Sequence, residues 1–277
     1  MDLQRRRQLF VFDRLLVRLF HVLKDAVVLK GGLVIELRLA RARTTKDIDL
    51  RMIGSPDDVL ARMQEAGRLD LGDYLQFEVV ADRRHPGIAA EGMAYRGLRY
   101  RAEARLAAKL YGTPFGIDVA FGEPMHGRPD EVEGSTFLDF AGLEPGRFRI
   151  YPLETHIAEK LHAYTLPRKR PNSRVKDFPD IALLATARDI DGAMLRAAID
   201  RTFDHRATHP VPASVPQPPS AWEPVYGRIA ANDGLIWRTL KDVTEAVRSF
   251  LDPVLAGAST IWDPETWAWS EGEHDAL

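Results

Sequence analysis

Apolar and polar residues follow two different periods along the chain. Between residues 8 and 23, apolar side chains recur every three or four positions, which predicts an amphipathic helix. The apolar run AVVLK at 26–30 predicts a short buried strand that ends at the pair Gly31 and Gly32, and LVIELRLARA at 33–42 predicts a helix. This region is therefore expected to run strand, glycine turn, helix.

The segments that follow favour a sheet. DIDLRMI at 47–53 alternates polar and apolar residues like a half-buried strand, and PDDVLARMQEAGRL at 56–69 predicts a helix. Further strands are predicted at 75–82, 95–106 and 115–123, with Gly and Pro between them. The first half of the chain thus mixes strands and helices around one sheet.

Helical patterns dominate the second half. Helices are predicted at 153–166, 177–188, 191–203 and 235–251. We therefore expect an α+β fold with a core domain at 1–150 and a mainly helical domain at 151–277.

Two segments of the second half are not predicted as helix. The proline-rich stretch at 209–224 is expected to cross the surface, because proline lacks the backbone N–H that a helix interior uses. Near the end of the chain, Trp262, Trp267 and Trp269 predict a strap that packs on the helices.

Composition narrows the class of protein. The 277 residues are 45% hydrophobic, enough to fill a sizeable core, and 38 basic against 40 acidic residues give a net charge of −2. This balance excludes a histone-like binder of nucleic acid, so charged partners must be met by local patches. With no cysteine, disulfides and thiolate metal sites are excluded.

Targeting signals are also not expected. Asp13, Arg14 and Arg18 interrupt the apolar stretch that a signal peptide would need, and no run of about 18 apolar residues could span a membrane. A cytoplasmic location is the expectation.

Two aspartates in DIDLRMI are candidates for metal binding. On a strand, Asp47 and Asp49 would project from one face with backbones roughly 6.5 to 7 Å apart. Asp118 in FGIDVAF is the proposed third acid, since its apolar neighbours point to the other face. Carboxylates about 5 Å apart repel by roughly 3 kcal/mol at an effective dielectric of 20, a penalty that Mg²⁺ would remove.

Each of these features has a plainer interpretation. A D-x-D pair at a strand end is more often turn chemistry than a metal site. Gly31 and Gly32 would suit a tight turn as well as a phosphate-binding helix N-terminus. Only the combination of glycine turn, helix, D-x-D strand and a later lone acid is specific.

That combination resembles the nucleotidyltransferase superfamily typified by DNA polymerase beta, and more closely the AbiEii/AbiGii toxin family. The segments that carry the resemblance are LKGG at 29–32, RTTKDIDL at 43–50, IDV at 117–119, PLETHIAEKLHAY at 152–164 and RVKDFPDIALLA at 174–185. It implies a nucleotidyltransferase-like mixed sheet flanked by helices and followed by a C-terminal helical region.

The resemblance also implies roles for the candidate residues. Asp47, Asp49 and Asp118 would hold two Mg²⁺ ions, and Gly31 and Gly32 would form the turn that holds the triphosphate of a nucleotide. Many superfamily members have serine at the second glycine, so here no hydroxyl from that position assists the triphosphate.

A second group of candidates lies in the helical half. Lys160 borders the apolar stripe of its predicted helix, where it could simply extend its ammonium to solvent; the resemblance implies that it contacts nucleotide phosphates. In KDFPD, Asp177 could cap a helix, whereas the resemblance places Lys176, Asp177 and Asp180 in the active site without saying which aspartate is catalytic.

A basic run joins the two helices that carry these motifs. It consists of Arg168, Lys169, Arg170, Arg174 and Lys176. Such runs are usually solvated loops, but here contacts to nucleic-acid phosphates, or to nucleotide phosphates through Lys176, are expected.

These expectations combine into one function. A metal-dependent enzyme would transfer a nucleoside monophosphate from a nucleoside triphosphate to an acceptor hydroxyl. The resemblance implies the toxin of a toxin–antitoxin or abortive-infection pair, with a cognate antitoxin protein as partner and tRNA as the first acceptor to test. The alternatives are a small-molecule nucleotidyltransferase of the aminoglycoside type and a non-catalytic nucleotide-binding module.

Overall fold

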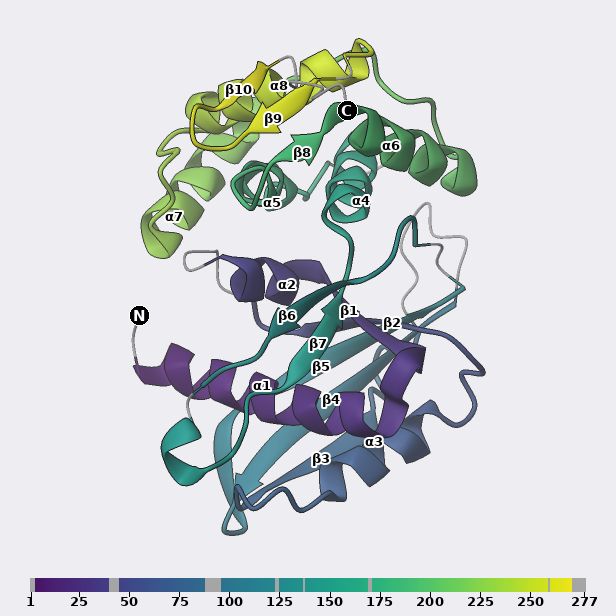
Figure 1. Ribbon diagram of the computed structural model, residues 1–277, viewed down its shortest axis with the longest axis vertical. Helices are drawn as coiled ribbons and strands as arrows, with labels where there is room; N and C mark the ends of the chain where they lie inside the picture. Colours follow the sequence, from purple (N-terminus) through teal and green to yellow (C-terminus); the bar gives the residue numbers. More distant parts are fainter. Residues whose placement is uncertain are drawn as a thin grey trace, which may run out of the picture. The chain divides into compact units, whose positions relative to one another are not determined.

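The chain folds into two compact units in the computed structural model (Figure 1). The residues that the structure describes are 3–39, 45–87, 96–122, 125–136, 138–168, 171–258 and 260–270. The first unit runs essentially to Tyr151, and the second consists mainly of residues from Pro152 onward with two short segments of the first half. Among the described residues, no helix is both long and apolar enough to cross a membrane.

The first unit is a mixed sheet with helices. Its helices are α1 (Leu3–Leu23), α2 (Gly31–Arg38) and α3 (Val59–Arg68), with short 3-10 turns η1 (Lys24–Ala26) and η2 (Asp139–Ala141). Its strands are β1 (Val27–Lys30), β2 (Ile48–Met52), β3 (Leu75–Ala81), β4 (Arg96–Leu106), β5 (Lys109–Phe121), β6 (Asp130–Glu133) and β7 (Arg147–Ile150). The described strands form a seven-stranded sheet in the order β3-β4-β5-β2-β1-β7-β6. The pairs β2–β5 and β1–β7 are parallel and the others antiparallel.

Strict alternation in the central strands divides the sheet into an apolar face and a polar face. In β2, Ile48 and Leu50 are fully buried, while Asp49 between them is only half-buried. In β5, Ile117 and Val119 are fully buried on either side of Asp118. The apolar side chains join one hydrophobic core with α1 and α3, so the aspartates must point to the opposite face.

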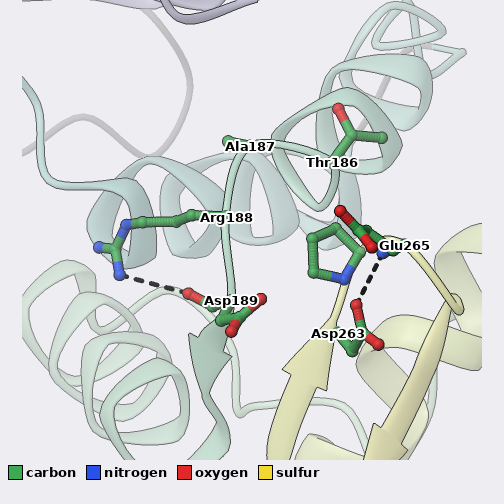
Figure 2. Close-up of a pocket in the computed structure, with 7 residues that line it drawn as sticks. Thr186, Ala187, Arg188, Asp189, Asp263 and Glu265 are labelled. Carbon is green, nitrogen blue, oxygen red and sulfur yellow. Dashed lines mark hydrogen bonds between the residues drawn. The ribbon is translucent and has the colours of Figure 1, made fainter.

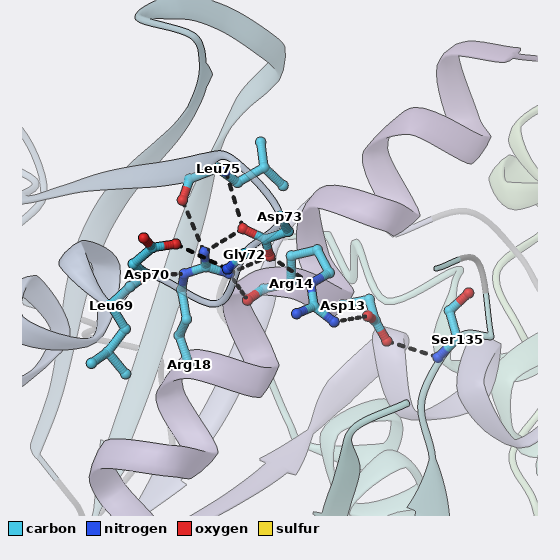
Figure 3. A network of polar contacts seen from close by, with 9 residues as sticks. All are labelled: Asp13, Arg14, Arg18, Leu69, Asp70, Gly72, Asp73, Leu75 and Ser135. Atoms are coloured by element: carbon cyan, nitrogen blue, oxygen red, sulfur yellow. Dashed lines mark hydrogen bonds and ion pairs between the residues drawn. The ribbon is translucent and has the colours of Figure 1, made fainter. Parts of the chain in front are cut away.

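A buried ionic network fastens α1 to the loop before β3 (Figure 3). Arg18, fully buried, donates from Nη2 and Nη1 to the two carboxylate oxygens of Asp73 at 2.6 and 2.8 Å. Arg14 Nε donates to the same carboxylate at 2.7 Å, and Arg18 also reaches the carbonyl oxygens of Leu69 and Leu75. The loop is thereby held against the helix that covers the core.

The second unit is mainly helical. Its helices are α4 (Leu153–Thr165), α5 (Asp177–Leu184), α6 (Gly192–Arg206), α7 (Glu223–Asp233) and α8 (Leu240–Leu255), with a 3-10 turn η3 (Ser220–Trp222). Its strands β8 (Ile190–Asp191), β9 (Ile261–Asp263) and β10 (Ala268–Ser270) form a small antiparallel sheet.

The predicted tryptophan strap is confirmed. Trp262 is fully buried and its indole N–H donates to the carbonyl of Ala185 at 2.9 Å. Trp269 donates to the carbonyl of Phe250 at 2.9 Å, and Trp267 donates to the hydroxyl of Ser249 at 3.0 Å. The three indoles therefore tie the β9–β10 hairpin to α5 and α8.

The strands β6 to β10, the 3-10 turns and helix α7 were not predicted. The strands β6 and β7 span only four residues each, DEVE and RFRI, which is too short for an alternation of polar and apolar residues to identify a strand. Helix α7 begins inside the segment expected to cross the surface, because Pro224 stands at the start of the helix, where the missing N–H costs nothing.

Candidate active site

Four charged residues form a row across the polar face of the sheet. Asp49 of β2 is the register partner of Asp118 of β5, in a parallel pair. Asp49 is also opposite Lys30 of β1, and Asp118 is opposite Arg99 of β4. The order across the sheet is therefore Lys30, Asp49, Asp118, Arg99, with two acids side by side between two cations.

Arg99 binds Asp118 with both arms of its guanidinium. Nε donates to Oδ1 at 2.7 Å and Nη2 donates to Oδ2 at 2.6 Å, a bidentate pair. This hydrogen bonding to Asp118 is the main cause that raises the pKa of Arg99 above its ordinary value, and the charges of Asp118, Asp47 and Asp82 add to it. Arg99 and Lys30 were not singled out from the sequence, because strand register, which brings them beside the acids, cannot be read from one chain.

Glycine is required at the start of α2. Gly31 has φ of +71°, and a Cβ built on it would lie 1.9 Å from Oδ2 of Asp49. No other residue fits there without moving that carboxylate. The first turn of α2 thus lies directly against one of the two paired acids, with the buried Gly32 next in the chain.

Asp47 does not lie on the strand as predicted. β2 begins at Ile48, and Asp47 is an exposed bend residue just before it. Its Oδ1 accepts the N–H of Gly116 at 3.0 Å, so its side chain bonds to the backbone of β5. The prediction that Asp47 and Asp49 both lie on one strand is therefore wrong for Asp47, which immediately precedes the strand.

The segment before Asp47 is anchored to α2. Glu36 accepts the N–H of Thr45 at 2.6 Å, and Arg5 donates to the carbonyl of Thr45 at 2.7 Å. Glu36 is itself paired with Arg5. These contacts fix where the chain enters β2 and so where Asp47 starts.

The donor set suits a hard divalent cation, since Asp47, Asp49 and Asp118 all supply carboxylate oxygens beside paired strands. Across the part of the chain that the structure describes, no group of three or more acidic, His or Cys side chains is gathered to hold a metal ion. Asp118 faces Arg99 and Asp47 faces Gly116, so gathering the three requires side-chain rotation.

A second cluster lies in the helical unit. Lys160 of α4 donates from Nζ to Oδ1 of Asp177 at 3.0 Å and to Oδ2 of Asp180 at 2.7 Å. The side chain of Asp180 is fully buried, that of Asp177 is 5% exposed and that of Lys160 is 14% exposed. The alternative in which Lys160 extends to solvent is therefore wrong.

The capping alternative for Asp177 is also wrong. Helix α5 begins at Asp177 itself after Lys176, and no side chain caps it. The carboxylate of Asp177 bonds to Lys160 instead and lies 3.9 Å from Nε of Arg174. Because the two acids are buried and both bond to Lys160, the cluster links α4 to α5 within the second unit.

The basic run is described only in part. Arg168 donates to the carbonyl of Ala163 near the end of α4 at 3.1 Å. Arg174 is 42% exposed and Lys176 is exposed, whereas Lys169 and Arg170 lie outside the described residues.

A separate concavity of about 800 Å³ lies elsewhere in the helical unit (Figure 2). Its lining residues are Thr186, Ala187, Arg188, Asp189, Asp263, Pro264 and Glu265. Three of the seven are acidic, and none is a predicted site residue. An acidic lining disfavours a polyphosphate, so this concavity does not suit a nucleotide.

A family profile described as the nucleotidyl transferase AbiEii toxin of type IV toxin–antitoxin systems matches residues 14–268. The chain belongs to the AbiEii family. It is thus a nucleotidyltransferase toxin by family, and the family resemblance seen in the sequence is confirmed. No curated protein is significantly similar to this AbiEii chain in sequence.

Solved structures share the AbiEii fold. MenT4, a nucleotidyltransferase toxin from Mycobacterium tuberculosis H37Rv, has a TM-score of 0.58 at 18% identity, covering 98% of this chain and 90% of that one. JHP933 from Helicobacter pylori has a TM-score of 0.56 at 13% identity, covering 92% of this chain and 94% of that one. The expected α+β nucleotidyltransferase fold is confirmed.

Proposed function

We propose that this AbiEii protein is a Mg²⁺-dependent enzyme that transfers a nucleoside monophosphate from a nucleoside triphosphate to an acceptor hydroxyl, with tRNA as the first acceptor to test. The observation that carries the proposal is the register pairing of Asp49 with Asp118 directly against the Gly31 turn. Two carboxylates side by side at a helix N-terminus provide ligands for a metal ion next to backbone N–H groups that favour phosphate, which suits a metal–triphosphate complex.

Different residues are proposed to bind the metal ions and the triphosphate. Asp47, Asp49 and Asp118 would hold two Mg²⁺ ions, which when bound lower the pKa of the attacking hydroxyl and neutralise the pyrophosphate that leaves. The N–H groups of Gly31 and Gly32 supply donors for triphosphate oxygens at the positive end of α2.

The proposed reaction is a displacement at the α-phosphorus of the nucleoside triphosphate. The acceptor oxygen forms a bond to the α-phosphorus, and the bond from that phosphorus to the β-phosphate oxygen breaks, releasing pyrophosphate. Asp118 is proposed as the acid nearest the attacking oxygen, where it takes up the hydroxyl proton.

Lys160 is proposed to contact the nucleotide phosphates. Its hydrogen bonds to Asp177 and Asp180 hold the ammonium group in one place. Lys176 is proposed as a further phosphate contact of the nucleotide, and the basic run of Arg168, Lys169, Arg170 and Arg174 as contacts to the RNA backbone. A cognate antitoxin protein is the proposed partner that relieves toxicity.

A transfer assay tests the proposal. Purified protein is incubated with Mg²⁺, each labelled nucleoside triphosphate in turn, and total RNA, protein or an aminoglycoside. Label is expected in RNA, and removal of Mg²⁺ by a chelator should stop it. Label in the aminoglycoside alone would favour the small-molecule enzyme, and nucleotide binding without labelled product would favour the non-catalytic module.

Two variants make the assay specific. Asp47→Ala and Asp49→Asn should each lower transfer by at least about a hundredfold, as loss of transition-state charge stabilisation does, and both should abolish growth arrest on expression. Asp58→Asn is the matched control, because Asp58 is an exposed acid of the same unit whose side chain makes no cap hydrogen bond. Undiminished transfer by Asp47→Ala would contradict the proposal.

A further inference from the structure

Asp118 has a cationic partner within the chain. Both of its carboxylate oxygens accept from Arg99, at 2.7 and 2.6 Å. The two residues are register partners on adjacent strands, so the short separation of their backbones is set by the sheet. A divalent ion could reach this carboxylate only by displacing the guanidinium or by sharing the oxygens with it.

Sharing is unfavourable because two cations on one carboxylate repel each other at short range. The guanidinium does not lose its charge near neutral pH, so deprotonation cannot resolve the conflict. Asp47 and Asp82 also act on Arg99 electrostatically, which strengthens its hold on this position.

Displacement is sterically open. The side chain of Arg99 is 39% exposed, against 17% for Asp118, so the guanidinium can rotate away while the acid stays. A guanidinium that leaves a carboxylate needs another anion of matching geometry, and a phosphate group offers the same two-point contact.

We propose that Arg99 competes with the divalent cation for Asp118 and yields when a triphosphate offers its guanidinium another partner, so that metal loading is coupled to nucleotide binding. This inference rests on the proposed function. Arg99 is then a positioning residue that keeps the third acid from binding metal in the absence of substrate.

The test measures Mn²⁺ affinity of the full-length protein by electron paramagnetic resonance, with and without an α,β-methylene triphosphate that cannot be cleaved. Without nucleotide, Arg99→Gln is expected to bind Mn²⁺ about tenfold more tightly than wild type, since a cation in direct contact with a ligand has been removed. The gain in Mn²⁺ affinity that the analogue produces should shrink by a similar factor.

Arg101→Gln is the matched control. Arg101 lies two positions along the same strand, on the same face, opposite Gly116 instead of Asp118. The Arg101→Gln variant loses the same positive charge but leaves Asp118 paired with Arg99. Its Mn²⁺ affinity should therefore stay within about twofold of wild type. Equal tightening by both variants would show a general field effect and overturn the inference.

Three further outcomes of the Mn²⁺ measurement would overturn the inference. Mn²⁺ affinity that is unchanged or weaker in a folded Arg99→Gln protein overturns the competition, even if wild type transfers nucleotides as proposed. Absence of Mn²⁺ binding by any variant, with or without the analogue, overturns both this inference and the proposed function. If Arg99→Gln does not fold, Arg99→Lys supplies the test, because a lysine cannot bridge both oxygens and should tighten Mn²⁺ binding by about threefold; no tightening overturns the inference.

Discussion

At the scale of single residues, the contact between Gly31 and Asp49 links backbone conformation to the candidate chemistry. A positive φ and the absence of a Cβ together let the first turn of α2 lie against a carboxylate. The sequence predicted a glycine turn beside an acid pair, but it could not show which glycine meets which acid. That detail depends on the antiparallel pairing of β1 with β2.

Gly31→Ala should therefore lose transfer activity and stability together. Any L-residue at this φ costs about 1–2 kcal/mol, and here the new methyl group must also displace the Asp49 carboxylate. Gly122→Ala is a close control, because Gly122 has φ of +72° with nothing within 4 Å of the added Cβ. Chemical denaturation should show the φ cost in both variants and the excess only in Gly31→Ala, with transfer preserved in the control.

At the scale of elements, buried ion pairs rather than apolar contacts alone fix which segments pack together. Asp73 accepts from Arg14 and Arg18 and holds the loop before β3 on α1. Burial alone would raise the pKa of Asp73, but the hydrogen bonds from Arg18 and Arg14 outweigh it and lower the pKa to about 2. In the unfolded chain the same carboxyl returns to its ordinary pKa.

The sign of this shift predicts acid sensitivity. Because the folded pKa is depressed, the stabilisation is present above pH 4 and is lost as the pH falls through about 2. A shift of this size corresponds to about 2 kcal/mol of unfolding free energy. Asp73→Asn should flatten the fall in stability between pH 4 and 2, measured by denaturant unfolding at each pH; an unchanged slope would contradict it.

The ion pairs of Lys160 with Asp177 and Asp180, which join α4 to α5, should also contribute to stability. Lys160→Met removes the cation that the buried Asp177 and Asp180 share, which should cost about 3–5 kcal/mol of unfolding free energy. Lys241→Met is the control, since Lys241 pairs with Glu245 on an exposed stretch of α8 and its loss should not change stability measurably. A Lys160→Met protein as stable as wild type would contradict this expectation.

At the scale of the whole molecule, hydrophobic periodicity was enough to predict the fold class, most helices and the strands β1 to β5. It failed at strands of two to four residues, β6 to β10, and where proline stands at the start of a helix, at α7. Asp47, Asp49 and Asp118 were found from their types and spacing, and Asp177 and Asp180 from the family resemblance. The partner of Asp118 was not, because Arg99 and Asp118 are 19 residues apart and meet only through strand register.

The tryptophan strap has a practical consequence. All five tryptophans of the protein, Trp222 and Trp237 as well as the three of the strap, lie in the second unit. Tryptophan fluorescence therefore reports on the second unit alone. The first unit contains tyrosines but no tryptophan, so it contributes little to the emission measured when tryptophan is excited. Comparing fluorescence with circular dichroism during unfolding would reveal whether the two units melt together or one before the other.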